Sequence, residues 1–264
     1  MYETRYHRPQ SLADAVALFT ADARYISGGQ TLIPTMKQRL AAPSDLIDIA
    51  RLPELRGIAA TADGVAISAA MTHAEVSDSG AVKTSIPALA ALAGTIGDPA
   101  VRHMGTLGGS IANNDPAADY PAALVALGAT VHTDRRAIAA EDFFAGLFST
   151  ALEDGEIVVR VEFRAPAKAA YEKFRNPASR YAMAGVFVAV MKDGAIRVAV
   201  TGAGNNGVFR ATAIEEALAK FWTPAAVDTV TIDPADMLAD IHGSAAYRAN
   251  LVKVMAKRAV AAAG

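Results

Sequence analysis

Two short glycine-rich segments carry the residue types that could bind a phosphate group. The first is SGGQTL at residues 27–32, which follows a short apolar run, and the second is TLGGS at residues 106–110. Paired glycines permit a positive φ or a close approach of another group to the backbone. Exposed N–H groups in such a turn can donate to phosphate oxygens. A Gly-Gly pair is more often an ordinary turn, but two such turns 80 positions apart could converge on one pyrophosphate.

The remaining reactive residue types form no pattern of a catalytic or metal site. Ser110 lies outside a Gly-x-Ser-x-Gly elbow and has no obvious base, so a hydrolase triad is unsupported. The absence of cysteine excludes disulfides, thiolate-bound zinc and cysteine-held iron–sulfur clusters within the chain. The five histidines are scattered without metal-ligand spacing and are interpreted as structural: His7, His73, His103, His132 and His242.

Composition and charge restrict the class of protein. The chain has 264 residues, of which 52% are hydrophobic and 20% charged, so it can bury a core and suits two or three subdomains. No stretch approaches the ~20 apolar residues of a membrane span, and the N-terminus has no secretory h-region. A net charge of -2 argues against nucleic acid or an anionic membrane as the main partner. These features favour a cytoplasmic protein.

Local signals mark where the elements that hold the glycine segments should begin. Capping patterns predict helices that start at Ser11, Thr72, Thr212 and Ser244. Asp-Gly pairs at residues 63–64 and 193–194 predict β-hairpins. A helix is also expected through residues 36–40, whereas residues 105–114 are interpreted as an irregular glycine-rich segment. Strands followed by helices indicate an α+β fold in three pieces, at residues 1–52, 53–165 and 166–264.

The glycine segments and their surroundings resemble a known family. The stretch SGGQTLIPTMKQRL at residues 27–40 is similar to a signature of molybdenum-hydroxylase flavin subunits. The block from IGDPAVR at residue 96 through GTLGGS to NNDPAADYP at residue 121 resembles the long central block of the same family. Stretches near residues 171–182, 208–212 and 242–248 also fit. The chain resembles, over essentially its whole length, the FAD-binding medium subunit of the xanthine dehydrogenase and aerobic carbon monoxide dehydrogenase family.

This resemblance implies a fold, an activity and partners. Residues 1–52 and 53–165 would form a two-subdomain p-cresol-methylhydroxylase-type FAD-binding fold, and residues 166–264 a C-terminal α+β domain. The chain would hold FAD non-covalently and pass electrons from [2Fe–2S] clusters to an external acceptor. Molybdopterin would lie in a large partner subunit and the [2Fe–2S] clusters in a small one, in a dimer of heterotrimers. The resemblance implies an oxidoreductase subunit without nucleic acid or an integral membrane span.

The resemblance also implies which residues contact FAD. Residues 27–32 would bind the pyrophosphate, and residues 106–110 would complete that cradle. Asp119 resembles the acid that contacts ribose or ribityl hydroxyls, and Arg175 stands where several relatives have lysine. The full set of implied cofactor contacts is Tyr25, Ile26, Ser27, Gly28, Gly29, Gln30, Thr31, Leu32, Ile96, Thr106, Leu107, Gly108, Gly109, Ser110, Asp119, Val158, Arg175 and Tyr181.

Simpler interpretations stay open beside these. Asp119 could cap the helix that begins near Pro121, Tyr181 could be ordinary core, and Arg175 could be a solvated side chain. The whole chain could instead be a self-contained FAD-dependent oxidase or dehydrogenase on the same fold. It could also be a non-catalytic assembly protein that has lost FAD. The resemblance favours the electron-transfer subunit over both rivals.

Overall fold

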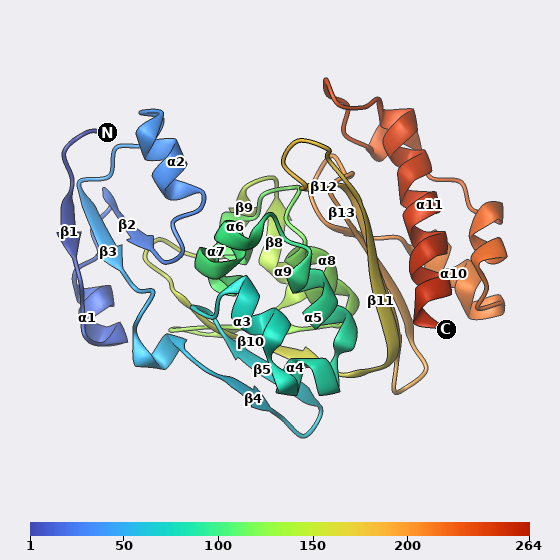
Figure 1. Cartoon of the computed structure of the whole chain (residues 1–264), viewed down its shortest axis with the longest axis horizontal. Helices are drawn as coiled ribbons and strands as arrows, with labels where there is room; N and C mark the ends of the chain where they lie inside the picture. The colour runs from blue at the N-terminus through green and yellow to red at the C-terminus, as the bar shows by residue number, and fades with distance from the viewer.

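The chain forms three β-sheets that follow one another along the sequence. The structure is a computed structural model that describes residues 1–264. The sheets use residues 5–48, 58–164 and 166–210, with a two-stranded ribbon, β8 (Phe144–Gly146) and β9 (Ser149–Thr150), beside the second. Figure 1 shows them from left to right in chain order, with the C-terminal helix to the right of the third sheet. The subdomain boundaries given above stay a prediction.

The first sheet is small and parallel. Its strand order is β1-β3-β2, with β1 (Arg5–His7), β2 (Ala23–Ile26) and β3 (Asp45–Asp48). The helices α1 (Leu12–Ala17) and α2 (Leu32–Lys37) provide the crossovers that parallel strands require. The core beneath α1 includes Ala70 and Ile157 from the second sheet region, so the first sheet is anchored on the middle of the molecule.

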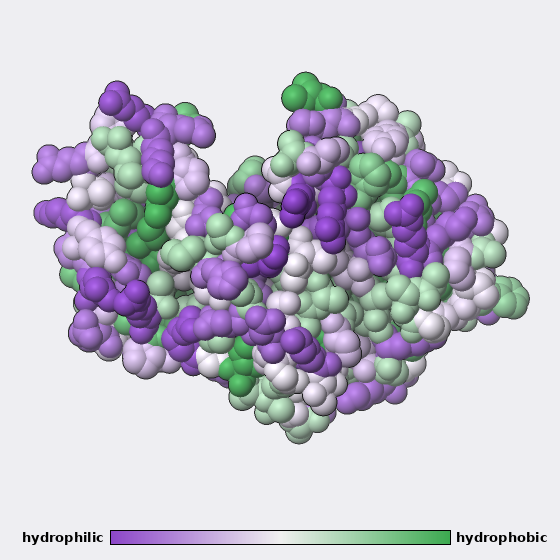
Figure 2. All heavy atoms as spheres, viewed as in Figure 1, coloured by the Kyte–Doolittle hydropathy of each residue, from purple (hydrophilic) through white to green (hydrophobic).

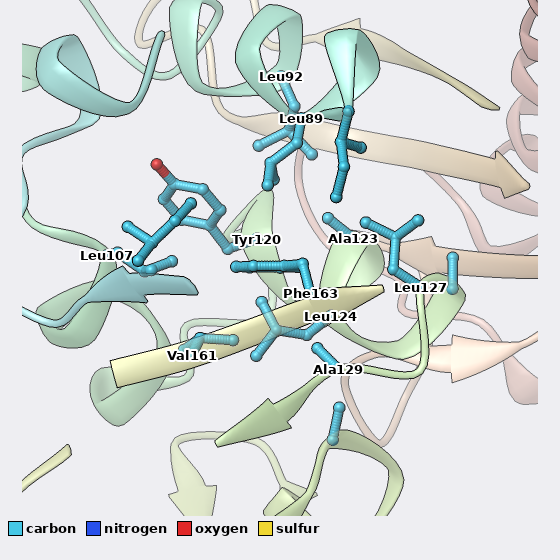
Figure 3. Packing of buried hydrophobic residues seen from close by; sticks show 14 of the residues in the cluster. Leu89, Leu92, Leu107, Tyr120, Ala123, Leu124, Leu127, Ala129, Val161 and Phe163 are labelled. Carbon is cyan, nitrogen blue, oxygen red and sulfur yellow. The ribbon is translucent and has the colours of Figure 1, made fainter. Parts of the chain in front are cut away.

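The second sheet is antiparallel and carries most of the helices. Its order is β4-β5-β10-β6-β7, with strands Ile58–Ala60, Gly64–Ser68, Val158–Arg164, Thr130–Thr133 and Ala137–Ala139. Its 33-residue core lies between the sheet and the helices; Figure 3 shows Tyr120, Leu124 and Phe163 meeting there. The helices are α3 (His73–Asp78), α4 (Gly80–Ser85), α5 (Pro87–Gly94), α6 (Pro99–Met104), α7 (Leu107–Asn113), α8 (Tyr120–Ala126) and α9 (Ala140–Phe143).

The third sheet is covered on both faces. Its strands are consecutive and antiparallel: β11 (Pro166–Arg175), β12 (Ala182–Met191), β13 (Ile196–Thr201) and β14 (Phe209–Arg210). Phe187 belongs to the core of the middle region, whereas Val186 and Val188 pack towards α11 (Ala245–Ala263). Burial on both faces explains why β12 is almost continuously apolar. The remaining helices are α10 (Thr212–Lys220) and the 3₁₀ helices η1 (Pro53–Leu55), η2 (Pro224–Thr229) and η3 (Pro234–Asp236).

Most of the predicted element boundaries are confirmed. Ser11 and Ser244 cap α1 and α11, and Thr72 forms a complete capping box with Glu75 at the start of α3. The two Asp-Gly turns join β4 to β5 and β12 to β13, as predicted. No helix in the structure is both long enough and apolar enough to cross a membrane.

Three local predictions are wrong. The second helix spans residues 32–37 rather than 36–40, because Arg39 takes a left-handed φ of 63° that ends it. Residues 99–113 are largely helical, since Asp98 and Thr106 cap α6 and α7 with their side chains. Thr212 is the first residue of α10 and not its cap. Glu215 binds Arg210 and the N–H of Val198 instead of closing a capping box.

Candidate functional site

A large cleft runs between the N-terminal lobe and the rest of the molecule. Its volume is about 1180 Å³, above the ~300–1,000 Å³ of ordinary small-molecule pockets. The wall takes residues from the β2–α2 turn, from segment 96–119, from segment 148–158, and Ser179 and Tyr181 from the start of the third sheet. Figure 2 shows the surface hollowed between the N-terminal lobe and the remainder. The cleft is therefore long and open, and all three sheet regions contribute to it.

The first glycine segment presents a row of free donors to this cleft. The backbone N–H groups of residues 27–32 donate no hydrogen bond within the chain, and all six residues line the cleft. A helix start leaves at most four N–H groups free, so six in succession exceed what α2 requires. Gly29 has a φ of 66°, which lets the chain turn sharply after β2. The hydroxyl of Ser27 is also buried without a partner.

The first glycine segment lies against the residues that immediately precede the second. A Cβ on Gly28 would lie 2.1 Å from the carbonyl oxygen of Met104 and 2.8 Å from Cα of Gly105. The absence of a side chain at Gly28 therefore permits contact between the β2–α2 turn and the end of α6. Thr106 follows directly and also lines the cleft. Both segments thus border one cleft.

The second segment differs from the expectation that it presents free N–H groups. The N–H of Leu107 donates to Met71 O at 3.0 Å and that of Gly108 to Ala69 O at 2.8 Å. The N–H of Gly109 donates to Thr106 Oγ1, and that of Ser110 to Thr106 O. Because these four donors already have acceptors, the segment cannot act as a second row of free amides. Thr106, Gly108, Gly109 and Ser110 nevertheless line the cleft, and Gly109 is exposed.

Gly108 is required for packing rather than for a special backbone angle. A Cβ there would lie 2.5 Å from Cβ and 2.9 Å from the carbonyl oxygen of Ala69. Its φ is not positive, which corrects the expectation of a turn. A larger residue at this position would clash with Ala69 and disturb the packing of α7 against the end of β5. Its first effect would therefore be on the fold and not on ligand binding. Leu107 is fully buried in the core and does not line the cleft, so its role as a cofactor contact stays a prediction.

Asp119 is held in a buried network and does not cap α8. Its carboxylate accepts from Tyr171 Oη at 2.5 Å and from Lys173 Nζ at 2.9 and 3.0 Å. The side chains of Asp119 and Lys173 are 5% and 2% exposed. Burial raises the pKa of Asp119, and the charge of Lys173 opposes that rise. The α8 cap makes no side-chain bond, so the capping interpretation is wrong. The ion pair fastens β11 to the cleft wall.

Lys173 is the member of this network that the sequence analysis did not single out. Tyr171 and Lys173 are two positions apart on β11 and therefore point to the same face of the sheet. Arg175 also has that parity, but it is exposed at the end of the strand and does not line the cleft. Its role as a cofactor contact receives no support from this geometry and stays a prediction.

The other implied contacts lie in the cleft wall. Ile26, Ile96, Val158 and Tyr181 all line it. Tyr181 is only partly buried, and its Oη accepts from Asn176 Nδ2 at 3.0 Å. Tyr25 donates to Gly155 O and stacks on Phe19 with ring centroids 5.0 Å apart. Burial raises the pKa of Tyr25 to about 12. These side chains give the cleft apolar and aromatic surface beside its row of amides.

His73, which the sequence analysis interpreted as structural, lies in the cleft wall. It lines the cleft, is 4% exposed, and its Nδ1 is buried without a hydrogen-bond partner. Burial, helped by the nearby charge of Arg102, lowers the pKa of His73 to about 4, so the ring is neutral near pH 7. Unpaired buried polar atoms are uncommon in native proteins. Two such atoms, Ser27 Oγ and His73 Nδ1, lie on residues of the cleft wall.

The cleft and its amide row have the shape and the donors that a phosphate-bearing, elongated ligand requires. The family described as "FAD binding domain in molybdopterin dehydrogenase" matches residues 2–166. The carbon monoxide dehydrogenase medium chain of Hydrogenophaga pseudoflava is 37% identical, over 98% of this chain and 96% of that one. The nicotine 6-hydroxylase medium subunit of Paenarthrobacter nicotinovorans is 34% identical, over 98% and 97%.

A solved structure agrees with these sequence comparisons. It is that of a carbon monoxide dehydrogenase from Hydrogenophaga pseudoflava which lacks the Mo-pyranopterin moiety of the molybdenum cofactor. It superposes with a TM-score of 0.89 at 36% identity, covering 99% of this chain and 97% of the matched one. The chain therefore belongs to the family of FAD-binding medium subunits of molybdenum hydroxylases, and the resemblance seen in its motifs is confirmed.

Proposed function

We propose that this chain holds one FAD non-covalently in the cleft and transfers electrons between partner [2Fe–2S] clusters and an external acceptor. The observation that carries the proposal is the row of six free backbone amides at residues 27–32. Hydrogen bonds from N–H groups to an ionised acceptor are about twice as strong as neutral ones. A pyrophosphate is the part of FAD that could use several such donors at once.

The residues present fit this cofactor. All three sheet regions contribute residues to the wall of the cleft. These residues include glycines with free amides, hydroxyl-bearing side chains and aromatic rings. The sequence contains no cysteine, which removes one of the usual covalent links to flavin. When bound, the isoalloxazine ring supplies one- and two-electron redox chemistry, while the protein supplies binding, orientation and electrostatics.

Each part of the wall has a proposed task. Residues 27–32 bind the pyrophosphate, and the hydroxyls of Thr106 and Ser110 add donors from the opposite side. Asp119, fixed by Lys173, accepts from ribose or ribityl hydroxyls. Ile96, Val158 and Tyr181 contact the planar rings. No His, Asp or Glu group is arranged to hold a metal, and the chain's task is to place and tune the flavin.

The partners belong to the same proposal. A large molybdopterin subunit would oxidise the substrate and a small subunit would carry the [2Fe–2S] clusters, in a dimer of heterotrimers in the cytoplasm. Support comes from the medium-chain names of relatives that act in carbon monoxide and nicotine oxidation. One alternative, a self-contained flavin oxidase, would need a substrate site within this chain. The other alternative, an assembly protein that has lost FAD, would not need the free amides.

The isolated chain should bind FAD but oxidise no substrate. We expect that carbon monoxide, aldehydes, purines or nicotine, mixed anaerobically with the FAD-loaded chain, leave the flavin absorption band unchanged. Chemically reduced flavin on the same protein should still reduce a dye, since no catalytic side chain is needed for that step. Rapid bleaching by one of the substrates would show a self-contained flavoenzyme. A chain that cannot be loaded with FAD would contradict the proposal altogether.

A charge placed at Gly109 should weaken FAD binding without unfolding the protein. Gly109 is exposed in the cleft, and its added Cβ meets only Thr106 Oγ1, the cap of α7, at 2.9 Å, a contact that Asp and Asn share. A carboxylate ~6 Å from a phosphate costs about 2–3 kcal/mol at an effective dielectric of about 20, or roughly 30- to 150-fold in affinity. We expect that loss for Gly109→Asp relative to Gly109→Asn, which has the same shape without charge. Equal affinities in a spectral titration would place the phosphate elsewhere.

A further inference from the structure

A strained aromatic residue stands at the rim of the cleft. Phe148 lies at the tip of the β8–β9 ribbon with a φ of 53°, in the left-handed region. A bulky non-glycine residue rarely adopts this conformation, which costs energy unless the surroundings impose it. The side chain is nevertheless 62% exposed, so burial of the ring in the core does not compensate for the strain. The backbone conformation at Phe148 therefore lowers the stability of the fold, while the aromatic side chain remains exposed.

One buried residue imposes this conformation. Asn114 is 3% exposed and donates from Nδ2 to Gly146 O at 2.7 Å and to Ser149 O at 2.8 Å. Its own carbonyl accepts from the N–H of Phe148 at 3.0 Å. Asn114 ends α7, the helix that begins with the second glycine segment at the cleft. The ribbon tip is therefore clamped to the same helix that forms the cleft wall.

The clamp places the ring of Phe148 in the cleft rather than elsewhere on the surface. Phe148 and Thr150 of the ribbon line the cleft, as does Tyr181 from the start of the third sheet. Leu147, the neighbouring apolar residue of the tip, is 40% exposed and does not line it. The cleft therefore has an aromatic residue from the middle region and another from the C-terminal region, and both remain partly exposed.

We propose that Phe148 is a ring-contact residue that packs against the isoalloxazine of FAD. The inference rests on the proposed function, because it requires the flavin to lie in this cleft. Aromatic side chains gain about 0.5–1.5 kcal/mol from offset or edge contacts with another ring, beyond area burial. The isoalloxazine, rather than the adenine, suits this position because the ring that exchanges electrons must remain within reach of partners and acceptors. The rim near Phe148 is open to solvent in this chain.

The test separates ring contact from a purely structural role of the ribbon tip. Phe148→Asn removes the ring and places at the tip a residue that tolerates a positive φ. We expect the FAD-free variant to melt at the wild-type temperature or about 2–4 °C above it. We also expect its FAD dissociation constant to rise about tenfold and the visible absorption and circular dichroism of the bound flavin to change. Phe148→Tyr should retain wild-type affinity, and Leu147→Asn is the matched control that should change none of these.

Three outcomes decide the matter. Unchanged FAD affinity and flavin spectra in Phe148→Asn, with FAD bound by the wild-type chain, would overturn the inference while leaving the proposed function intact. An equal loss of affinity for ADP, measured by calorimetry, would also overturn it, because the ring would then contact adenine. A wild-type chain that binds no FAD would overturn the inference and the proposed function together.

Discussion

Lys173→Met should lower the free energy of unfolding by about 3–5 kcal/mol at neutral pH. Removing one partner of a buried ion pair leaves the other charge uncompensated, and losses of that size are typical. Here the orphaned group would be Asp119, whose side chain is only 5% exposed and which would keep the hydroxyl of Tyr171 and the influence of the Arg175 charge. Urea denaturation followed by Trp222, the single tryptophan, gives the measurement, since this residue packs beside Lys168 near the third sheet.

The destabilisation should depend on pH in a defined direction. Burial already raises the pKa of Asp119 in the folded protein, and loss of Lys173 should raise it further. The folded variant then binds a proton more readily than the unfolded chain, so its stability increases as pH falls towards the unfolded value of about 3.9. The difference between variant and wild type should therefore shrink in acid. A difference that grows as pH falls would contradict a buried, unpaired carboxylate.

A double variant distinguishes stability from cofactor binding. Asp119→Leu with Lys173→Met replaces the pair by apolar side chains, a change that is often neutral or stabilising. We expect it to recover most of the lost stability. If Asp119 also accepts from FAD hydroxyls, the double variant should fold well yet bind FAD weakly. Full recovery of both properties would limit the pair to a structural role.

The sequence predicted the local parts of this site better than the contacts between them. Helix starts such as Ser11 and Thr72 depend on residues three or four positions apart, and the structure confirms them. The pairing of Asp119 with Lys173 joins positions 54 residues apart and has no local signal. Tyr171 and Lys173 are two positions apart and so share one face of their strand. Only this spacing could have suggested that they have a common partner. Long-range pairing therefore required the structure.

The glycine segments illustrate the same limit. Both were identified from their composition, and Gly28 contacts Met104 and Gly105, directly before the second segment; that they converge on one pyrophosphate stays a prediction. Which amides remain free could not be predicted, because the acceptors of Leu107 and Gly108 are carbonyls of Ala69 and Met71 in another segment. Free donors depend on tertiary packing, whereas glycine pairs are visible in the sequence. As a result, the two segments looked equivalent in the sequence, but only residues 27–32 have free backbone amides.

Gly28→Ala should reduce FAD affinity by about 100-fold or more while the core stays folded. The added Cβ would lie 2.1 Å from the Met104 carbonyl oxygen, and backbone atoms cannot move aside as a side-chain end can. Residues 27–32 must then shift away from α6, and the row of amides moves with them. Loss of one or two hydrogen bonds to a charged group, at about 1.5–3 kcal/mol each, accounts for that change in affinity.

The fold should tolerate this substitution better than the cofactor does. Gly28 is only partly buried and lies outside the clusters of buried core residues. The matched control is Gly80→Ala at the start of α4, where a Cβ meets nothing within 4 Å. That variant should keep both its melting temperature and its FAD affinity. Spectral titration with FAD and thermal melts of both variants make the comparison. Wild-type FAD affinity in Gly28→Ala would show that the free amides of residues 27–32 do not hold the pyrophosphate.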